Sequence, residues 1–340
     1  MRKIRVIQIA FLIAILLLIM GNGCSGITSS TTTVFPVDNA DNAAGSNLSG
    51  AVNATDTVSV VPAQPSFFDF PIPEASGLLV EKNQNAEVDF SNTADGYVMV
   101  RFIRPTEMNL RVQITGPSGV VYTYFLNQRG DFEVFPLSDG DGAYTVGVFE
   151  QIEGNKFATA IKVEIDVALT DEFAPFLRPN QYINFNRESA IVRKAAELVG
   201  GVSGFFEKVN AIYTFVINNI TYDIAFAEAV LAGGHIGYIS DIDDVLARGK
   251  GICLDYAALM TGMLRSQGIP TKLVVGYAGD VYHAWISVFS AETGWVNNII
   301  TFDGNDWNLM DPTFASSGNQ SAEVMQFIGD GANYRAMFFY

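Results

Sequence analysis

The spacing of the apolar residues changes once along this chain, and this change divides it into parts that must fold differently. Between residues 66 and 170, apolar and polar side chains alternate in short runs separated by glycine-rich turns. A strand with this alternation has one face against a core and the other in water. About eight such strands in roughly a hundred residues predict an antiparallel β-sandwich over 66–170. The clearest runs are 86–90, 110–115 and 161–167.

Helical spacing appears after about residue 171. Apolar residues recur at intervals of three and four over 188–199, which ends at Gly200, and again over 205–220. Later segments again look extended, so residues 171–340 are predicted to form a second domain that mixes helices with strands. The strands expected here are 271–277, 283–289 and a run that ends near Asp311.

The first residues have the features of a secretory signal. Basic residues up to Arg5 precede a nearly unbroken apolar run from Val6 to Met20, and small residues follow. The run is shorter than the ~20 residues that a membrane-spanning helix needs. Residues 1–23 are therefore predicted to be a signal peptide, and the protein is expected to be exported.

Cys24 directly follows the small residues and resembles the lipidation site of bacterial lipoproteins, in which the acylated cysteine becomes the new N-terminus. Gly23 fits that motif, whereas Gly21 stands where Leu is usual. An ordinary cleaved signal and an uncleaved anchor remain alternatives. Lipidation predicts an extracytoplasmic, membrane-anchored lipoprotein at the cell surface or periplasmic face. Residues 24–65 are too polar to bury a core and are predicted to be a disordered linker.

Charge argues against one class of partner. The formal net charge is −16, and no cluster of Lys and Arg follows Arg5, so no nucleic-acid partner is expected. Asp139 and Asp141 lie in a glycine-rich turn, but no further acid has EF-hand spacing, and a solvated turn is favoured over a calcium site. His235 has no Cys or His at zinc-ligand spacing and is expected at the surface or a cleft rim. No metal and no cofactor are predicted.

Cys253 is the residue on which a chemical function depends. If Cys24 is acylated, Cys253 has no partner within the chain, and such a thiol is either inert or kept for its reactivity. Glycines precede it, and apolar residues at helical spacing follow it to Leu264. A cysteine in the first turn of a helix is shifted toward thiolate by the dipole and the unpaired N–H groups. The alternative is a small apolar filler at a loop-to-helix junction.

Two distant residues favour the reactive thiol. His283 lies 30 residues after Cys253 in a predicted strand, where it shares a face with Trp285. Asp311 follows 28 residues later, after an apolar step. A carboxylate can hold an imidazole in the tautomer that accepts a thiol proton. We therefore predict a catalytic triad of Cys253, His283 and Asp311.

These segments resemble the core of the transglutaminase-like superfamily over roughly residues 205–315. The resemblance rests on Gly-Ile-Cys-Leu-Asp-Tyr-Ala, Leu-Arg-Ser-Gln-Gly-Ile-Pro, His-Ala-Trp and Trp-Asn-Leu-Met-Asp-Pro-Thr, in this order. It implies an α+β, papain-like domain in which the cysteine helix packs on an antiparallel sheet. By position, Cys253 corresponds to the nucleophile, His283 to the general base and Asp311 to the orienting acid. Residues 142–148 are similar to one strand of bacterial pre-peptidase sandwiches.

Other positions are weaker candidates. Tyr222 resembles an upstream aromatic residue that some family members use in the oxyanion hole, although a packed core tyrosine fits as well. Trp285 and Asp255 are candidates for the substrate cleft, and for Asp255 a surface salt bridge is the simpler interpretation. Three aspartates are expected at a helix start, namely Asp241, Asp243 and Asp244.

The resemblance implies acyl transfer, in which a thiolate attacks an amide and a second nucleophile resolves the thioester. With water as that nucleophile, the enzyme is a peptidase or amidase that acts on a protein or peptide substrate. With a lysine amine, it is a protein-glutamine γ-glutamyltransferase that cross-links proteins. Hydrolysis is favoured because the extra domains of calcium-dependent animal cross-linkers are absent. A non-catalytic surface binding or scaffold module is the third hypothesis. The substrate, the ligand of the sandwich and the oligomeric state are not predicted.

Overall fold

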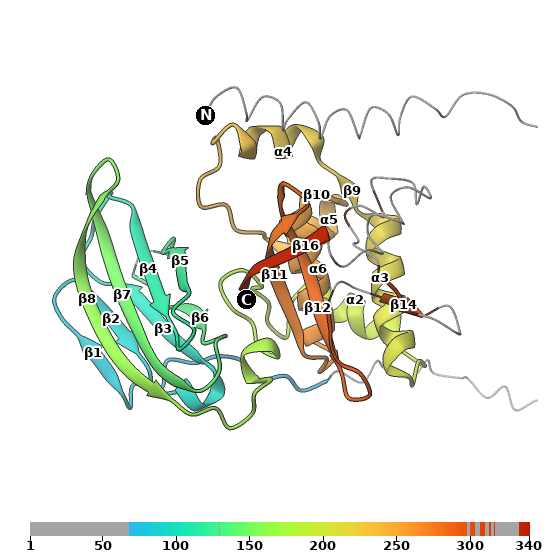
Figure 1. The fold of residues 1–340 in the computed structure, drawn as a ribbon, viewed down its shortest axis with the longest axis horizontal. Helices are drawn as coiled ribbons and strands as arrows, with labels where there is room; N and C mark the ends of the chain where they lie inside the picture. Colours follow the sequence, from blue (N-terminus) through green and yellow to red (C-terminus); the bar gives the residue numbers. More distant parts are fainter. Residues whose placement is uncertain are drawn as a thin grey trace, which may run out of the picture.

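The computed structural model describes residues 68–128, 130–297, 300–302, 307–309, 313, 316 and 333–340. The predicted signal peptide, Cys24, the linker and Asp311 lie outside these residues. Figure 1 shows a two-layered β-sandwich beside a domain in which helices pack on a sheet. The fold class predicted from the sequence is confirmed.

The sandwich consists of two four-stranded antiparallel sheets. One has the order β1 (Val80–Lys82), β2 (Ala86–Asp89), β3 (Tyr97–Phe102), β6 (Glu133–Pro136). The other has the order β5 (Val121–Phe125), β4 (Leu110–Thr115), β7 (Gly142–Glu153), β8 (Lys156–Val167). A 3₁₀ turn, η1 (Thr93–Asp95), precedes β3.

The predicted alternation holds in β4, in β5 and from Ile161 onward in β8, but fails in β2. In β4, Leu110, Val112 and Ile114 are buried while the residues between them are half-buried. In β2, however, Glu87 and Asp89 are buried as well, although the pattern predicts that they meet water. Asp89 accepts hydrogen bonds from the backbone of Gly77 and Ser91, so a preceding segment covers this face.

Asp139 and Asp141 have structural roles in the turn before β7. An oxygen of Asp139 accepts a hydrogen bond from the backbone N–H of Ser118 at 2.9 Å, and one of Asp141 accepts from that of Leu169 at 2.8 Å. No group of three or more His, Cys, Asp or Glu side chains suited to a metal occurs in the described part of the chain.

The second domain is built from five helices and a four-stranded antiparallel sheet, within the described residues. The helices are α2 (Ala190–Val199), α3 (Phe205–Asn219), α4 (Ile224–Leu231), α5 (Ile242–Arg248) and α6 (Cys253–Arg265). The sheet has the order β13 (Gly294–Asn297), β12 (Val281–Ser290), β11 (Thr271–Ala278), β16 (Tyr334–Phe339). Two short pairs accompany it, β9 (Thr221–Tyr222) with β10 (Lys250–Gly251), and β14 (Ile300–Phe302) with β15 (Trp307–Leu309).

The strand expected to end near Asp311 pairs differently from the prediction. Its described part, β15, pairs with β14 in a separate ribbon rather than with the main sheet. The position next to β11 is taken by β16, which pairs with it antiparallel and carries an irregularity between Val275 and Gly276. The expected strands at 271–277 and 283–289 are confirmed as β11 and β12.

Helix α6 occupies the centre of this domain, as expected. It is buried from Asp255 to Arg265 because α2, α3 and α5 cover one side and β11 and β12 the other. Met260 and Leu264 belong to one apolar core with Leu273 and Ile286 of the sheet. A helix that is apolar on all sides is stable only when it is enclosed in this way.

Arg265 is a fully buried cation at the end of α6. Its guanidinium donates to the carbonyl oxygens of Thr271 at 2.9 Å, Arg178 at 2.6 Å and Tyr340 at 2.6 Å. Burial lowers the pKa of Arg265 to about 9, so the group stays charged at neutral pH. One side chain thus joins α6 to β11, to the segment after the sandwich and to the residue that follows β16.

The sandwich and the second domain are in direct contact. Gln181 donates its backbone N–H to Val134 and its side-chain amide to the carbonyl oxygen of Phe125 and to Glu133. The ring of Tyr340 lies 5.7 Å from that of Tyr124 and 4.5 Å from that of Tyr182.

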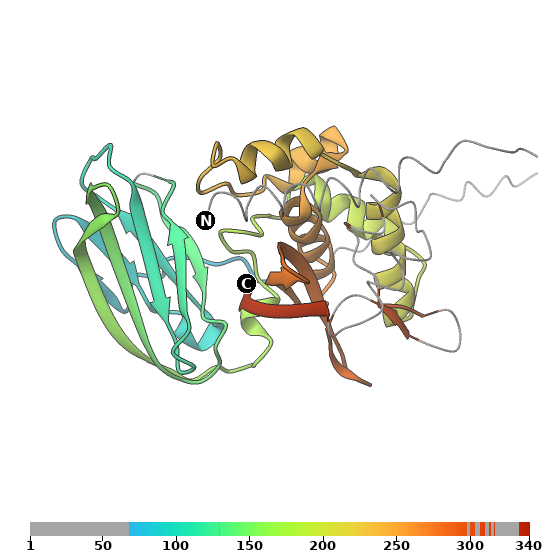
Figure 2. The same ribbon diagram turned by 45° about the horizontal axis from the view of Figure 1, so that its top comes forward.

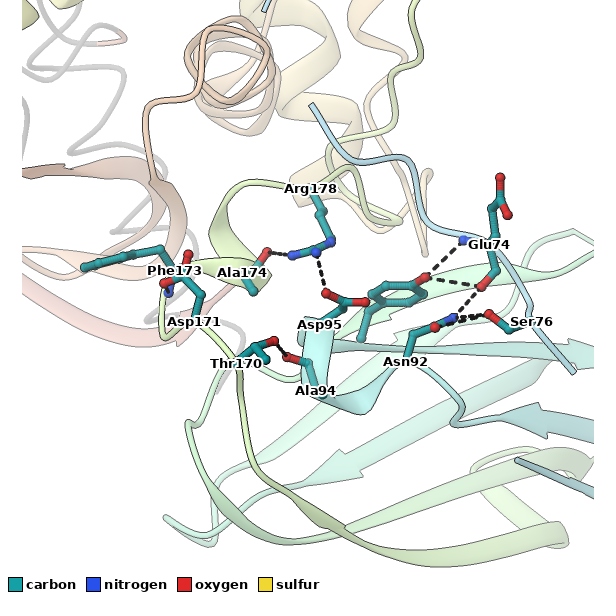
Figure 3. A network of polar contacts seen from close by, with 11 residues as sticks. Glu74, Ser76, Asn92, Ala94, Asp95, Thr170, Asp171, Phe173, Ala174 and Arg178 are labelled. Atoms are coloured by element: carbon teal, nitrogen blue, oxygen red, sulfur yellow. Dashed lines mark hydrogen bonds and ion pairs between the residues drawn. The ribbon is translucent and has the colours of Figure 1, made fainter. Parts of the chain in front are cut away.

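Close to η2 (Ala174–Phe176), a second set of polar contacts joins the two parts (Figure 3). There, Arg178 forms an ion pair with Asp95 at 2.7 Å, and within the sandwich Thr170, its last residue, bonds to the carbonyl oxygen of Ala94.

Candidate active site

Cys253 is the first residue of α6, as the sequence predicts. Gly249 ends α5 with φ +63°, a conformation that favours glycine, and the two residues of β10 then lead through Ile252 into the helix. The thiol is half-buried and free of disulfide bonding. The first N–H groups of a helix have no intrahelical partner, so Cys253 is beside free donors at the positive end of α6.

Asp255 is buried rather than at the surface. It is fully inaccessible, and its Oδ2 accepts the backbone N–H of Ile252 at 2.8 Å while its Oδ1 accepts the hydroxyl of Tyr238 at 2.6 Å. Arg248 lies 3.5 Å from Oδ2. The expected salt bridge is therefore present, to Arg248, but the carboxylate of Asp255 is buried rather than at the surface. Asp255 fixes the turn that carries Cys253, because it ties the residue before the cysteine to the helix.

Tyr238 is a residue that the sequence analysis missed. Burial, the hydrogen bond to Asp255 and the charge of that carboxylate raise the pKa of Tyr238, so its hydroxyl remains a donor. Its contact crosses 17 residues of sequence. No spacing rule in the sequence predicts a contact between these two residues. The sequence signal that could have pointed to Tyr238 was a tyrosine within the glycine-rich loop before α5.

Tyr222 lies in the strand beside the cysteine loop. Strand β9 pairs parallel with β10, and Tyr222 is opposite Gly251, two residues before Cys253. The backbone N–H groups of Thr221 and Asp223 donate to Gly249 and Gly251 at 2.9 and 2.8 Å. Tyr222 is half-buried. The structure thus places Tyr222 close to the cysteine loop, while its role in an oxyanion hole stays a prediction.

His283 and Trp285 lie on β12, against which α6 packs. Both are 4% exposed, and their rings are nearly parallel with centroids 6.2 Å apart. Gly276 is opposite His283 in β11, and a Cβ at that position would lie 2.9 Å from the Trp285 ring and 2.1 Å from the carbonyl oxygen of Arg335. The tryptophan therefore packs closely over β11 beside the histidine. Its part in a substrate cleft stays a prediction.

Tyr282 is at the start of β12. Burial raises the pKa of Tyr282, and the charges of Tyr277 and Cys253 raise it further. Its side chain is 57% exposed. Tyr282 directly precedes His283 in β12, and successive residues of a strand point to opposite faces of the sheet.

The chain beyond Asp311 returns to the same helix. Ser316 lies 2.9 Å from the hydroxyl of Tyr256 in α6 and donates to the carbonyl oxygen of Ile220 at 2.9 Å. Asp311 itself is not among the described residues. The meeting of Cys253, His283 and Asp311 in one triad therefore stays a prediction.

The remaining candidate residues from the sequence make packing or helix-capping contacts. His235 is exposed, with its ring 4.8 Å from that of Phe226. Asp241 caps α5 by accepting the N–H of Asp244 at 3.1 Å, which confirms the expected helix start. Asp243 accepts the N–H of Ile191 at 2.9 Å and joins α5 to α2.

A known family matches the part of the chain that contains the cysteine and the histidine. Residues 192–298 fit the sequence model of the transglutaminase-like superfamily. This chain contains a transglutaminase-like domain. The match covers Cys253, Tyr222, Asp255, His283 and Trp285 and ends before Asp311.

Several solved structures resemble parts of this chain at low sequence identity. One, from Cytophaga hutchinsonii, is described as a candidate cysteine protease; it is 19% identical, with 64% of this chain and 71% of that chain covered and a TM-score of 0.32. The periplasmic domain of TgpA from Pseudomonas aeruginosa is 16% identical, with 62% and 91% covered and a TM-score of 0.32. A protein described as a TGase is 22% identical, with 38% and 34% covered and a TM-score of 0.26. A search of curated proteins finds no match.

Within the described residues, no helix combines the length and the apolar character needed to cross a bilayer.

Proposed function

We propose that this protein is a thiol enzyme that hydrolyses amide bonds in proteins or peptides. The observation that carries the proposal is the position of Cys253 as the first residue of the central helix of a transglutaminase-like domain, with His283 on a strand that packs against that helix. The helix end supplies unpaired N–H groups and a positive dipole to the thiol.

In the proposed reaction, His283 accepts the proton of the Cys253 thiol, and the sulfur attacks the carbonyl carbon of the substrate amide. The tetrahedral intermediate collapses when the C–N bond breaks, and His283 gives its proton to the leaving amine. A thioester to Cys253 remains. Water, losing a proton to His283, attacks the thioester and releases a carboxylic acid and the free thiol.

Two further residues have supporting roles in this proposal. Asp311 holds the imidazole of His283 in the productive tautomer and stabilises its charged form. The contact of Ser316 with Tyr256 supports this role, because it brings the following chain to α6. The oxyanion is stabilised by the backbone N–H of Cys253 and by the hydroxyl of Tyr222, a role supported by the pairing of Tyr222 with Gly251.

We also propose that the enzyme works outside the cytoplasm, anchored to a membrane through acylated Cys24. In this proposal, residues 24–65 connect the anchor to the folded part of the chain and let the enzyme act on proteins near the membrane surface. Acylation is tested by metabolic labelling with a fatty-acid analogue and membrane fractionation. Cys24→Ala should lose the label and leave the membrane fraction; an unchanged fraction would contradict the anchor.

The activity is tested by incubating the protein with a mixture of denatured proteins and identifying new chain ends by mass spectrometry. Wild type should generate new ends, and Cys253→Ala and His283→Ala should each reduce the rate by about 10³-fold or more. A glutamine-containing peptide and a fluorescent amine are included in parallel. Incorporation of that amine in place of hydrolysis would instead assign the domain as a γ-glutamyltransferase.

Absence of any product that depends on Cys253 would favour a non-catalytic binding or scaffold module. The rate of alkylation by iodoacetamide across pH provides an independent measurement. A labelling profile with a midpoint near ~8.5, the value of a free cysteine, together with identical products from wild type and Cys253→Ala, would overturn the enzymatic proposal.

A further inference from the structure

An apolar segment that includes α4 stands beside Cys253 and has no role in the reaction described above. Residues 224–238, called here the α4 segment, contain Glu228 as the one acidic residue and no Lys or Arg. No residue of α4 is buried, although this helix consists almost entirely of apolar residues. Ile224 is 39% exposed and Ile236 is 80% exposed. Apolar helices normally turn such residues into a core, so this surface is available to a ligand.

Both ends of the α4 segment are attached next to the cysteine. At its start, the N–H of Asp223 donates to the carbonyl oxygen of Gly251, two residues before Cys253, at 2.8 Å. At its end, the hydroxyl of Tyr238 donates to Asp255, two residues after Cys253, at 2.6 Å. The segment therefore leaves and returns at the turn that carries the thiol, where Gly251 and Asp255 lie side by side. Two exposed isoleucines lie close in the chain to these attachments. Ile224 directly follows Asp223, and Ile236 comes two residues before Tyr238.

Further contacts hold the segment in place without burying it. Asp223 caps α4 by accepting the N–H of Phe226 at 3.0 Å and pairs with Lys250 at 3.1 Å. The ring of Phe226 lies 4.9 Å from that of Tyr238, which joins the helix to the returning loop. A preorganised apolar surface binds with a smaller loss of conformational entropy than a disordered one.

The sandwich supports the same segment from outside. A Cβ at Gly237 would come within 3.0 Å of the ring of Phe125 on β5, so the returning loop passes against the sandwich. Figures 1 and 2 show α4 at the periphery of the domain, with this loop on the side that faces the sandwich. The exposed apolar surface of the segment is thus held in a fixed position beside the candidate active site.

We propose that the α4 segment binds an apolar side chain of the peptide substrate next to the reacting amide, so that the enzyme selects sites flanked by residues such as Leu, Ile, Val or Phe. This inference rests on the proposed amide hydrolysis at Cys253. The near absence of charge on the segment argues for an apolar ligand rather than a charged one.

The test compares the residues found at cleavage sites in the denatured-protein digest. Wild type should enrich one apolar position next to the cleaved bond. Ile236→Glu and the double variant Ile224→Glu/Ile236→Glu should reduce the ratio of apolar to polar residues there by about tenfold, because a buried carboxylate disfavours an apolar ligand. Leu78→Glu is the matched control, since Leu78 is 82% exposed on the sandwich, and it should keep the wild-type ratio.

The outcomes separate this inference from the proposed function. An active wild type with no apolar enrichment, or variants with the wild-type ratio and the wild-type melting temperature, would overturn the role of the α4 segment while hydrolysis stands. Loss of self-association in Ile236→Glu, measured by light scattering, with the ratio unchanged, would assign the surface to contact between copies and also overturn it. A wild type without Cys253-dependent cleavage would overturn the proposed function itself.

Discussion

At the scale of single residues, the candidate site depends on a buried carboxylate that has no direct part in the chemistry. Asp255 receives hydrogen bonds from a backbone N–H on one side and a tyrosine hydroxyl on the other. Hydrogen bonds to a charged group contribute more than neutral ones, and an unpaired buried donor is costly. This residue therefore determines whether the turn that presents Cys253 keeps its shape.

We expect Asp255→Ala to lower the free energy of unfolding by about 3 kcal/mol, because both donors lose their acceptor. Tyr238→Phe removes one of the two bonds and should cost about 1–1.5 kcal/mol. Urea denaturation followed by circular dichroism measures both values. Equal stability of wild type and Asp255→Ala would show that the carboxylate does not hold the turn.

A second residue gives the protein a dependence on pH. The ammonium of Lys272 lies 3.8 Å from the ring centroid of Trp295, 4.7 Å from that of Phe176 and 5.1 Å from that of Phe339. Burial lowers the pKa of Lys272 to about 8, although the charge of Glu172 opposes this shift. The aromatic rings also attract the cation and offset part of the cost of burying it.

We expect the stability of wild type relative to Lys272→Met to rise between pH 8 and about 10.5. Below pH 8, Lys272 is protonated in the folded and unfolded states, and the cost of burying the charge is constant. Above it, the unfolded state binds more protons than the folded state, so stability increases with pH. Urea denaturation at several pH values measures the difference, in which the titration of the tyrosines cancels. A flat difference would mean that the rings keep Lys272 protonated.

At the scale of elements, the short strand β10 before α6 requires glycine at position 251. A Cβ at Gly251 would lie 2.5 Å from the Cβ of Asp255, so the crossing of β10 and the first turn of α6 needs glycine. Because Gly251 also accepts the N–H of Asp223 and pairs with Tyr222, any displacement moves the cysteine, the tyrosine and the base of the α4 segment together.

Gly251→Ala should therefore slow the alkylation of Cys253 and reduce any Cys253-dependent activity by at least tenfold. Gly200→Ala is the control, because the added Cβ there comes no nearer than 3.2 Å to its neighbours. Second-order rates with iodoacetamide measure the effect, and circular dichroism checks that both variants are folded. Identical rates for Gly251→Ala and wild type would contradict the requirement for glycine.

The sequence predicts well those helices and strands in which the periodic spacing of apolar residues runs through the whole element. The helix that begins at Cys253 and the strands at 271–277 and 283–289 belong to this group. The burial of Glu87 and Asp89 could not be predicted, because their polar pattern indicates water, whereas Arg101 pairs with Glu87 and a preceding segment bonds to Asp89. The bond between Tyr238 and Asp255 and the pairing of β16 with β11 link residues far apart in the chain, which no local period reveals. Residues that require close packing, such as Gly251 and Gly276, were likewise identifiable only in three dimensions.

At the scale of the whole molecule, the sandwich and the transglutaminase-like domain share an interface built around Tyr340 and Gln181. Arg265 controls this interface from within the second domain, because its guanidinium binds the carbonyl oxygens of Arg178 and Tyr340. The ring of Tyr340 in turn contacts Tyr122 and Tyr124 of the sandwich. The two parts should consequently unfold together in the wild-type protein.

Replacing Arg265 should both destabilise the protein and separate the two unfolding events. Arg265→Met removes a charged donor from three carbonyl oxygens, of which that of Tyr340 keeps the N–H of Leu273, and should cost roughly 3–5 kcal/mol. The three tryptophans of the chain are Trp285, Trp295 and Trp307, so tryptophan fluorescence reports the second domain, whereas far-ultraviolet circular dichroism also includes the strands of the sandwich.

Wild type should show one urea midpoint by both methods. In Arg265→Met the fluorescence midpoint should fall further than the dichroism midpoint, while Arg193→Met, at an exposed position of α2, should change neither. Two separate midpoints already in wild type would mean that the interface does not couple the domains.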